Sequence, residues 1–101
     1  MDMMDREFIR GFVKLYSLWR ASKDEVCGTQ IFEEMRTLGF NLSAGTIYPT
    51  LHKLLRENDV TATSRVLNGR VRKYYRLTRK GRRELEEVQD RLRVVVRKVF
   101  S

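Results

Sequence analysis

The sequence has one cysteine, one histidine and one proline among its 101 residues, and each scarcity excludes a class of protein. With Cys27 alone no internal disulfide can form, and with His52 as the single histidine there is no ligand set for zinc. We therefore expect no metal and no cofactor. Free cysteine behaves as a small apolar residue, so Cys27 should be buried.

The chain also lacks long apolar runs, repeats and low-complexity tracts. A membrane-spanning helix needs about 20 consecutive apolar residues, and no such run is present. The N-terminal MDMMDREF places acids where a signal peptide has a cationic lead, so we expect a cytoplasmic protein. An enzyme is not expected, because the sequence offers no carboxylate pair, no nucleophile with a base and no glycine-rich phosphate loop.

Positive charge, in contrast, is abundant and concentrated in one segment. Lys and Arg number 21 against 13 Asp and Glu, which gives a formal net charge of +8. Nine of these 21 lie between Thr61 and Arg83, where no acid occurs, and in the rest of the chain acids slightly outnumber bases. Such a cationic segment attracts polyanions, with nucleic acid or an anionic membrane as the candidates.

Apolar periodicity predicts a single domain over residues 1–101 with a modest core. Residues 5–20 form a helix whose apolar arc is wider than one core face needs, so it should contact two neighbours, one of them in another chain. Residues 22–29 are expected to be a polar break. Residues 29–58 contain two short amphipathic helices, the first ended by Gly39 and the second capped by Ser43, which together predict a helix-turn-helix.

Residues 60–77 switch from the helical period to alternation, and Asn68-Gly69 at their centre predicts a type I′ hairpin. The turn sets the register, with Val60 opposite Leu77 and Arg65 opposite Arg72. One face then carries Val60, Ala62, Val66, Val71, Tyr75 and Leu77, and the other carries Thr61, Thr63, Arg65, Leu67, Arg70, Arg72, Tyr74 and Arg76. Opposed like charges destabilise a ladder by some tenths of a kcal/mol, roughly, which a bound polyanion would relieve. A merely solvated basic face is the alternative.

The last predicted helix, residues 78–100, begins at Thr78 as its N-cap. Its apolar residues recur three and four positions apart, the seam spacing of helices that pack side by side. These residues are Leu85, Val88, Leu92, Val95 and Val99. Its first turn carries Arg79, Lys80, Arg82 and Arg83, where the helix dipole disfavours cations. These cations either contact phosphate or are simply screened by solvent.

The segment SAGTIYPTLHKLLRE combines an apolar helical stripe with Pro49, which costs roughly 3 kcal/mol inside a helix. If Ile47 faces the core, the outward side presents small, polar and basic residues: Gly45, Thr46, Pro49, His52, Lys53 and Arg56, with Tyr48 at the margin. Free N–H groups of the first turn can bond phosphate, and the polar side chains can reach base edges. The alternative is a proline merely tolerated near a helix start. For catalysis His52 lacks a partner.

SAGTIYPTLHKL resembles the recognition-helix signature of the PadR family of transcriptional regulators, and NGRVRKYYRLTRKG resembles the basic wing of that family. FIRGFVKLYSLWRAS and CGTQIFEEM are similar to its first and second helices, so the resemblance covers about residues 6–100. It implies an α+β, mainly helical winged helix-turn-helix with a two-stranded wing, dimerised through its first and last helices. The single C-terminal helix is similar to the shorter subgroup. Val71 departs from the family by interrupting the run of wing cations.

The resemblance implies a homodimeric repressor that binds a palindromic operator in double-stranded DNA. The resemblance, taken together with the outward side of the second helix of the helix-turn-helix, places the DNA contacts. They fall on Ser43, Thr46, Tyr48, Pro49, His52, Lys53, Arg65, Arg70, Arg72 and Lys73. The dimer interface would comprise Phe8, Phe12, Leu85, Val88, Leu92, Val95 and Val99. A small aromatic effector binds between the dimer helices in some members, and Phe12, Tyr16 and Trp19 would line such a pocket here unless they are ordinary core. The alternative function is a winged-helix module that binds a protein or RNA without a specific operator.

Overall fold

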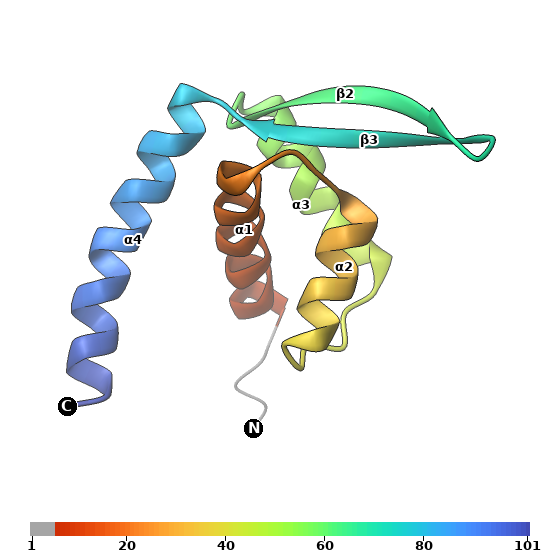
Figure 1. Ribbon diagram of the computed structural model, residues 1–101. Helices are drawn as coiled ribbons and strands as arrows, with labels where there is room; N and C mark the ends of the chain where they lie inside the picture. The colour runs from red at the N-terminus through yellow and green to blue at the C-terminus, as the bar shows by residue number, and fades with distance from the viewer. Residues whose placement is uncertain (1–5) are drawn as a thin grey trace.

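The computed structural model describes residues 6–101, in which helices pack against one side of a small antiparallel sheet (Figure 1). In chain order the elements are α1 (Arg6–Lys23), β1 (Val26–Cys27), α2 (Gly28–Thr37), α3 (Ala44–Arg56), β2 (Val60–Leu67), β3 (Arg70–Leu77) and α4 (Arg79–Val99). This is the mainly helical winged helix-turn-helix that the sequence predicted. The expected start of the first helix at residue 5 lies outside the described residues.

The sheet has three strands in the order β1-β3-β2, whereas the sequence predicted only the two-stranded hairpin. α1 continues to Lys23, and the segment expected to be a polar break contains β1. Val26 of β1 pairs with Tyr75 of β3, and Cys27 pairs with Tyr74. A strand of two residues is too short to show alternation in a sequence, so only its pairing with β3 reveals it.

β2 and β3 form the hairpin in the predicted register, from Val60 opposite Leu77 to Leu67 opposite Arg70. The turn residues Asn68 and Gly69 have φ angles of 52° and 75°, the left-handed pair that a type I′ turn requires. In Figure 1 the turn end of the hairpin extends beyond the helices, and every side chain of β2 after Val60 is exposed. The hairpin is therefore a protruding wing.

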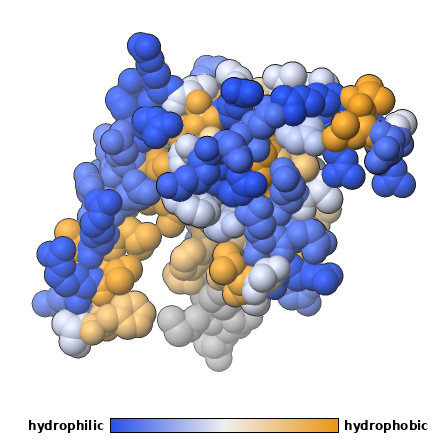
Figure 2. All heavy atoms as spheres, viewed as in Figure 1, coloured by the Kyte–Doolittle hydropathy of each residue, from blue (hydrophilic) through white to orange (hydrophobic). Residues whose placement is uncertain are grey.

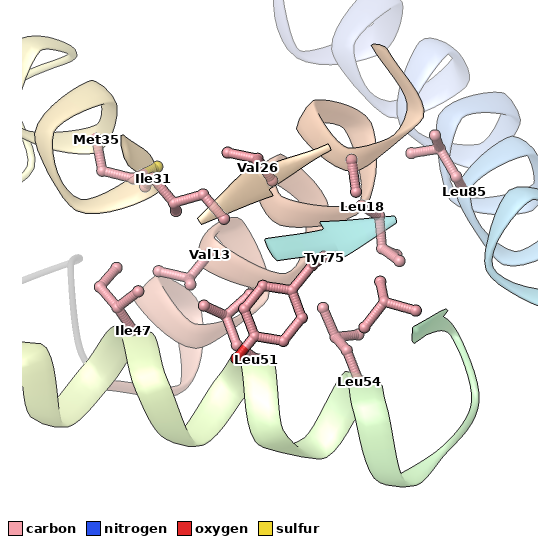
Figure 3. Close-up of a cluster of buried hydrophobic side chains, with 12 residues drawn as sticks. Val13, Leu18, Val26, Ile31, Met35, Ile47, Leu51, Leu54, Tyr75 and Leu85 are labelled. Atoms are coloured by element: carbon pink, nitrogen blue, oxygen red, sulfur yellow. The ribbon is translucent and has the colours of Figure 1, made fainter. Parts of the chain in front are cut away.

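The core lies between the helices and the base of the sheet (Figure 3). α3 contributes Ile47, Leu51 and Leu54, each no more than 1% exposed. The other core members are Val13, Leu18, Ala21, Val26, Ile31, Met35, Val60, Tyr75 and Leu85. Cys27 is buried, as predicted. The apolar stripe of α3 thus anchors the helix and leaves its opposite side exposed.

The turn between α2 and α3 has the predicted glycine terminator. Gly39 has a φ of 98°, and its N–H donates to the carbonyl of Arg36 while the N–H of Phe40 donates to that of Met35, both at 3.0 Å. This pair of bonds is a Schellman motif. Ser43 occupies the N-cap of α3, but its hydroxyl makes no capping bond, which leaves it free for a ligand.

The turn that follows α3 is bonded to the start of α4. The N–H of Thr78 donates to the carbonyl of Asp59 at 3.0 Å, and its hydroxyl donates to the carbonyl of Asn58 at 2.6 Å. The same hydroxyl accepts from the N–H of Gly81, so Thr78 is the predicted N-cap of α4. The ammonium of Lys80 lies 2.8 Å from a carboxylate oxygen of Asp59, which is fully buried. These bonds hold the start of α4 against the turn that follows α3, and we call this contact the α3–α4 joint.

Candidate nucleic-acid interface

The exposed side of α3 carries the residues that the sequence assigned to it. Gly45, Tyr48, Pro49, His52 and Lys53 are all exposed. Thr46 is half-buried, and Ser43 and Arg56, at the two ends of the helix, are exposed. This side combines small residues with hydrogen-bonding and basic ones, a composition suited to the edges of base pairs and to phosphates.

Pro49 affects the backbone chemistry of this side, although α3 runs through it from Ala44 to Arg56. Proline has no N–H, so the carbonyl of Gly45, four residues earlier, lacks its helical donor. The proline therefore removes one helical hydrogen bond from α3 and places its ring against the Gly45 carbonyl.

α3 lies between two hollows. On the wing side, a hollow of about 210 Å³ is shared by Tyr48 and His52 of α3 and Lys73 of β3, with Gly28 at the start of α2. A Cβ at Gly28 would lie 2.7 Å from Cε1 of Tyr48, so glycine is needed for the Tyr48 ring to sit against α2. On the other side, a surface hollow of about 490 Å³ is lined by residues of both α1 and α3. A surface hollow therefore borders the exposed side of α3 along each flank.

Two arginines of the wing, Arg65 and Arg76, bond to a carboxylate within the chain. Glu25, between α1 and β1, accepts hydrogen bonds from Arg65 at 2.7 Å and from Arg76 at 3.2 Å. The Arg65 guanidinium also lies 4.6 Å from the ring centroid of Tyr74, and Arg72 donates to the hydroxyl of Thr29 at 3.1 Å. The opposed charges on this side of the wing are therefore explained neither by a bound polyanion alone nor by solvation alone, because groups of the same chain also bond to these arginines.

The wing residues that the sequence assigned to DNA divide between the two faces of the sheet. Arg65 and Arg72 are cross-strand partners on the same face as Arg76 and Glu25. Lys73 lies on the other face and lines the hollow beside α3, and Arg70 is exposed next to the turn. Within residues 6–101 neither Arg70 nor Lys73 forms an ion pair. Among the wing residues assigned to DNA, these two cations are the ones most available to phosphate.

The cluster around Glu25 predicts a pH dependence of stability. The hydrogen bond from Arg65 is the main cause that lowers the pKa of Glu25 from its ordinary 4.5. A carboxyl whose pKa is lower in the folded chain stabilises the fold above its unfolded pKa, and this contribution is lost as pH falls through the folded pKa. We expect wild-type stability to fall more steeply than that of Glu25→Gln below about pH 4.5, in urea unfolding at a series of pH values. Glu86→Gln, an exposed carboxylate of α4, is the control, and coincident pH profiles for all three proteins would contradict the prediction.

The residues assigned to a dimer interface are mostly exposed in the single chain. The exposed fractions of Phe12, Leu92 and Val95 are 36%, 37% and 53%. Phe8, Val88 and Val99 are also exposed. Figure 2 shows apolar residues gathered on the side of α4 that faces α1, and hydrophilic residues along its outer side. Leu85, in contrast, is 3% exposed and belongs to the core of the chain itself, because it lies where α4 still packs on the body.

The three aromatics of the expected effector pocket do come together. Phe12, Tyr16 and Trp19 line an apolar hollow of about 240 Å³ between α1 and α4, with Leu92 opposite. Trp19 is 38% exposed, so it is not ordinary core of this chain. Burial, followed by a 2.5 Å hydrogen bond to Glu34, raises the pKa of Tyr16 to about 12, so its hydroxyl stays protonated and bonded to α2.

The four cations at the start of α4 have different surroundings. Lys80 is bonded to Asp59 and, at 3.1 Å, to Glu84. Its charge therefore stabilises the α3–α4 joint. Arg79, Arg82 and Arg83 are exposed.

None of the helices in residues 6–101 has the length and apolar character of a membrane span, and this part of the chain contains no cluster of three potential metal ligands.

Comparison with known proteins agrees with this architecture. Residues 18–87 match the model of the transcriptional regulator PadR-like family. The chain is 39% identical over 96 residues to transcriptional regulator Rv3488 of Mycobacterium tuberculosis. This alignment covers 95% of this chain and 90% of that protein. A PadR-like transcriptional regulator from Bacillus cereus superposes with a TM-score of 0.80 and 30% identity over 92% of each chain.

Bacillus subtilis PadR, solved in complex with operator DNA, is also similar. Its TM-score is 0.67 and its identity 28%, over 77% of this chain and 46% of that one. The family is one of regulators and not of enzymes, in agreement with the absence of catalytic motifs from the sequence. The family match spans more than half of the residues, and with the winged-helix fold it shows that the chain belongs to the PadR-like family of transcriptional regulators.

Proposed function

We propose that this chain is a cytoplasmic, homodimeric repressor that binds a palindromic operator in double-stranded DNA. The observation that carries the proposal is α3, anchored by its apolar stripe, with a hollow along each flank of its exposed side and a protruding wing beside it. The structure of Bacillus subtilis PadR in complex with operator DNA supports the same role for this chain. A protein- or RNA-binding module without an operator is the less favoured function.

In this proposal the amino half of α3 enters the major groove, which is about 12 Å wide and accepts a helix. Ser43, Thr46, Tyr48 and His52 contact base edges, with Pro49 between them. Lys53, Arg70 and Lys73 contact phosphates, and Arg65 and Arg72 add positive potential from the far face of the wing. Phosphate contacts position the protein, and base contacts select the sequence.

The dimer follows from the apolar surface that the single chain leaves uncovered. Phe12 of α1 and the residues of α4 beyond Leu85 are too exposed for a chain that works alone. A two-fold axis through these helices would place two copies of α3 on successive major grooves, about 34 Å apart. The hollow lined by Phe12, Tyr16 and Trp19 would then adjoin the dimer axis, where we propose that a small aromatic effector binds.

Selection of bound duplexes from a random pool tests the function directly. We expect a palindrome whose half-sites lie about one helical turn apart. Thr46→Ala and His52→Ala should each alter the preferred bases at particular positions, with about 1–3 kcal/mol of discrimination lost per contact. Thr37→Ala, at the exposed end of α2, is the control and should select the wild-type sequence. Binding that is indifferent to duplex sequence would favour the module without an operator.

A further inference from the structure

The hollow between α1 and α3 is cationic on both walls. Arg10 and Lys14 line it from α1, and Lys53 and Arg56 line it from α3. Among its lining residues the single acid is Glu57, at the carboxyl end of α3. On α1 the sequence predicted dimer contacts and the effector pocket but no contact with DNA. Arg10 and Lys14 are therefore cations that neither the recognition helix nor the wing accounts for.

None of these four cations forms an ion pair within residues 6–101. Some cations elsewhere are neutralised, as Arg65 is by Glu25 and Lys80 is by Asp59. Arg70 and Lys73 of the wing, in contrast, form no ion pair in the described part of the chain, in the same way as these four. Two helices that face each other with unneutralised positive charge gain nothing from the arrangement by themselves. An anion between them would gain from both walls.

The hollow is also elongated. It shares Arg10 and Gly45 with a second hollow of about 460 Å³ that continues past Ser43 to Asn41. The space above its two glycines is open, since a Cβ at Gly11 would meet no atom within 4 Å and one at Gly45 would meet only the Ser43 hydroxyl, at 3.5 Å. The two hollows form one groove along the α1 side of α3, which we name the α1 groove.

We propose that the α1 groove holds one phosphodiester strand of the operator, with Arg10 and Lys14 contacting successive phosphates from α1. This inference rests on the proposed function, in which α3 occupies the major groove. A helix with its side chains is about 10–12 Å across, nearly the width of that groove, so the two DNA strands must pass along its two flanks. Lys73 and the hollow on the wing side face one strand, and the α1 groove faces the other.

A strand of nucleic acid fits this groove better than a small anion does. The cations do not converge on one point, because Arg10 and Lys14 are four residues apart and Lys53 and Arg56 are three apart. The first pair therefore spans about 6 Å along its helix and the second about 4.5 Å. A linear row of positive charge on each wall matches a linear row of phosphates.

The test is the salt dependence of operator binding by the double variant Arg10→Ala/Lys14→Ala, using the duplex selected by the wild-type chain. Each phosphate contact contributes about 0.9 to the slope of log affinity against log salt, so losing two should flatten the slope by up to about 1.8. The order of preference among operator variants should not change, since phosphate contacts carry no base information. The matched control is Arg97→Ala/Lys98→Ala, which removes the same charge from the last turn of α4.

If both double variants flattened the slope equally, only net charge would matter. That result would overturn the proposal that a DNA strand lies in the α1 groove, but it would leave the proposed operator binding intact. An unchanged slope in Arg10→Ala/Lys14→Ala would do the same. If the wild-type chain bound no duplex, the proposed function itself would fail. Melting temperatures of the two double variants should match, and Arg10→Gln/Lys14→Gln replaces the first variant if they do not.

Discussion

Replacing Gly81 with alanine should lower the free energy of unfolding by roughly 3 kcal/mol, a large overpacking effect. The new Cβ would lie 2.1 Å from the carbonyl oxygen of Asp59 and 2.7 Å from Cδ1 of Leu77. A leucine side chain can turn aside, but the carbonyl is backbone and already accepts the N–H of Thr78 at 3.0 Å. The clash can therefore be relieved only by moving α4 away from the end of α3.

Thermal unfolding followed by circular dichroism measures this effect. For a domain of this size a loss of that magnitude corresponds to a fall in melting temperature of more than about 10 °C. The matched control is Gly11→Ala, also in a helix, where no atom lies within 4 Å of the new Cβ. It should stabilise the chain by up to about 1 kcal/mol, because alanine favours helix more than glycine does. If Gly81→Ala had the same melting temperature as the wild type, the prediction would be wrong, because the α3–α4 joint would have adjusted to the new Cβ without loss of stability.

Replacing both Leu92 and Val95 with aspartate should convert the proposed dimer to a monomer, as measured by analytical ultracentrifugation. Two carboxylates per chain would have to be buried without partners at the interface, which costs more than an apolar contact returns. Both residues are partly exposed in the single chain, so the fold itself should survive. Operator affinity should fall by about 10²- to 10⁴-fold, because the second half-site is then no longer held at high effective concentration.

A single aspartate at Val94 provides the control for this change. Val94 is 65% exposed and lies about 200° around α4 from Leu92, on the side away from the apolar seam. This variant should remain dimeric and bind the operator as the wild type does. If the double variant stayed dimeric, the interface would have to lie elsewhere, and the exposed apolar side of α4 would need another partner.

The strongest sequence predictions were those with local physical causes. Gly39 ends α2 because a left-handed residue is needed there. Asn68-Gly69 sets the hairpin register because a type I′ turn admits few other pairs, and every predicted strand partner was found. The stripe of Ile47, Leu51 and Leu54 oriented α3, so the exposed residues of the recognition helix could be named from periodicity alone.

The features that sequence reasoning missed depend on residues far apart in the chain. β1 exists only because β3 offers it a pairing edge. Glu25 neutralises Arg65, 40 residues later, only because β1 places it beside the wing. Leu85 fits the apolar seam of α4 by spacing, yet it is buried in the chain's own core because the first turns of α4 still pack on the body.

By itself, then, the sequence determined the winged-helix architecture, the family and the exposed side of α3, since caps, turns and periodicity act over a few neighbouring residues. Which cations are left for DNA was decided only by the tertiary structure. An ion pair depends on distances between atoms that chain order does not specify, so the cations held by Glu25 and those left open in the α1 groove look alike in the sequence.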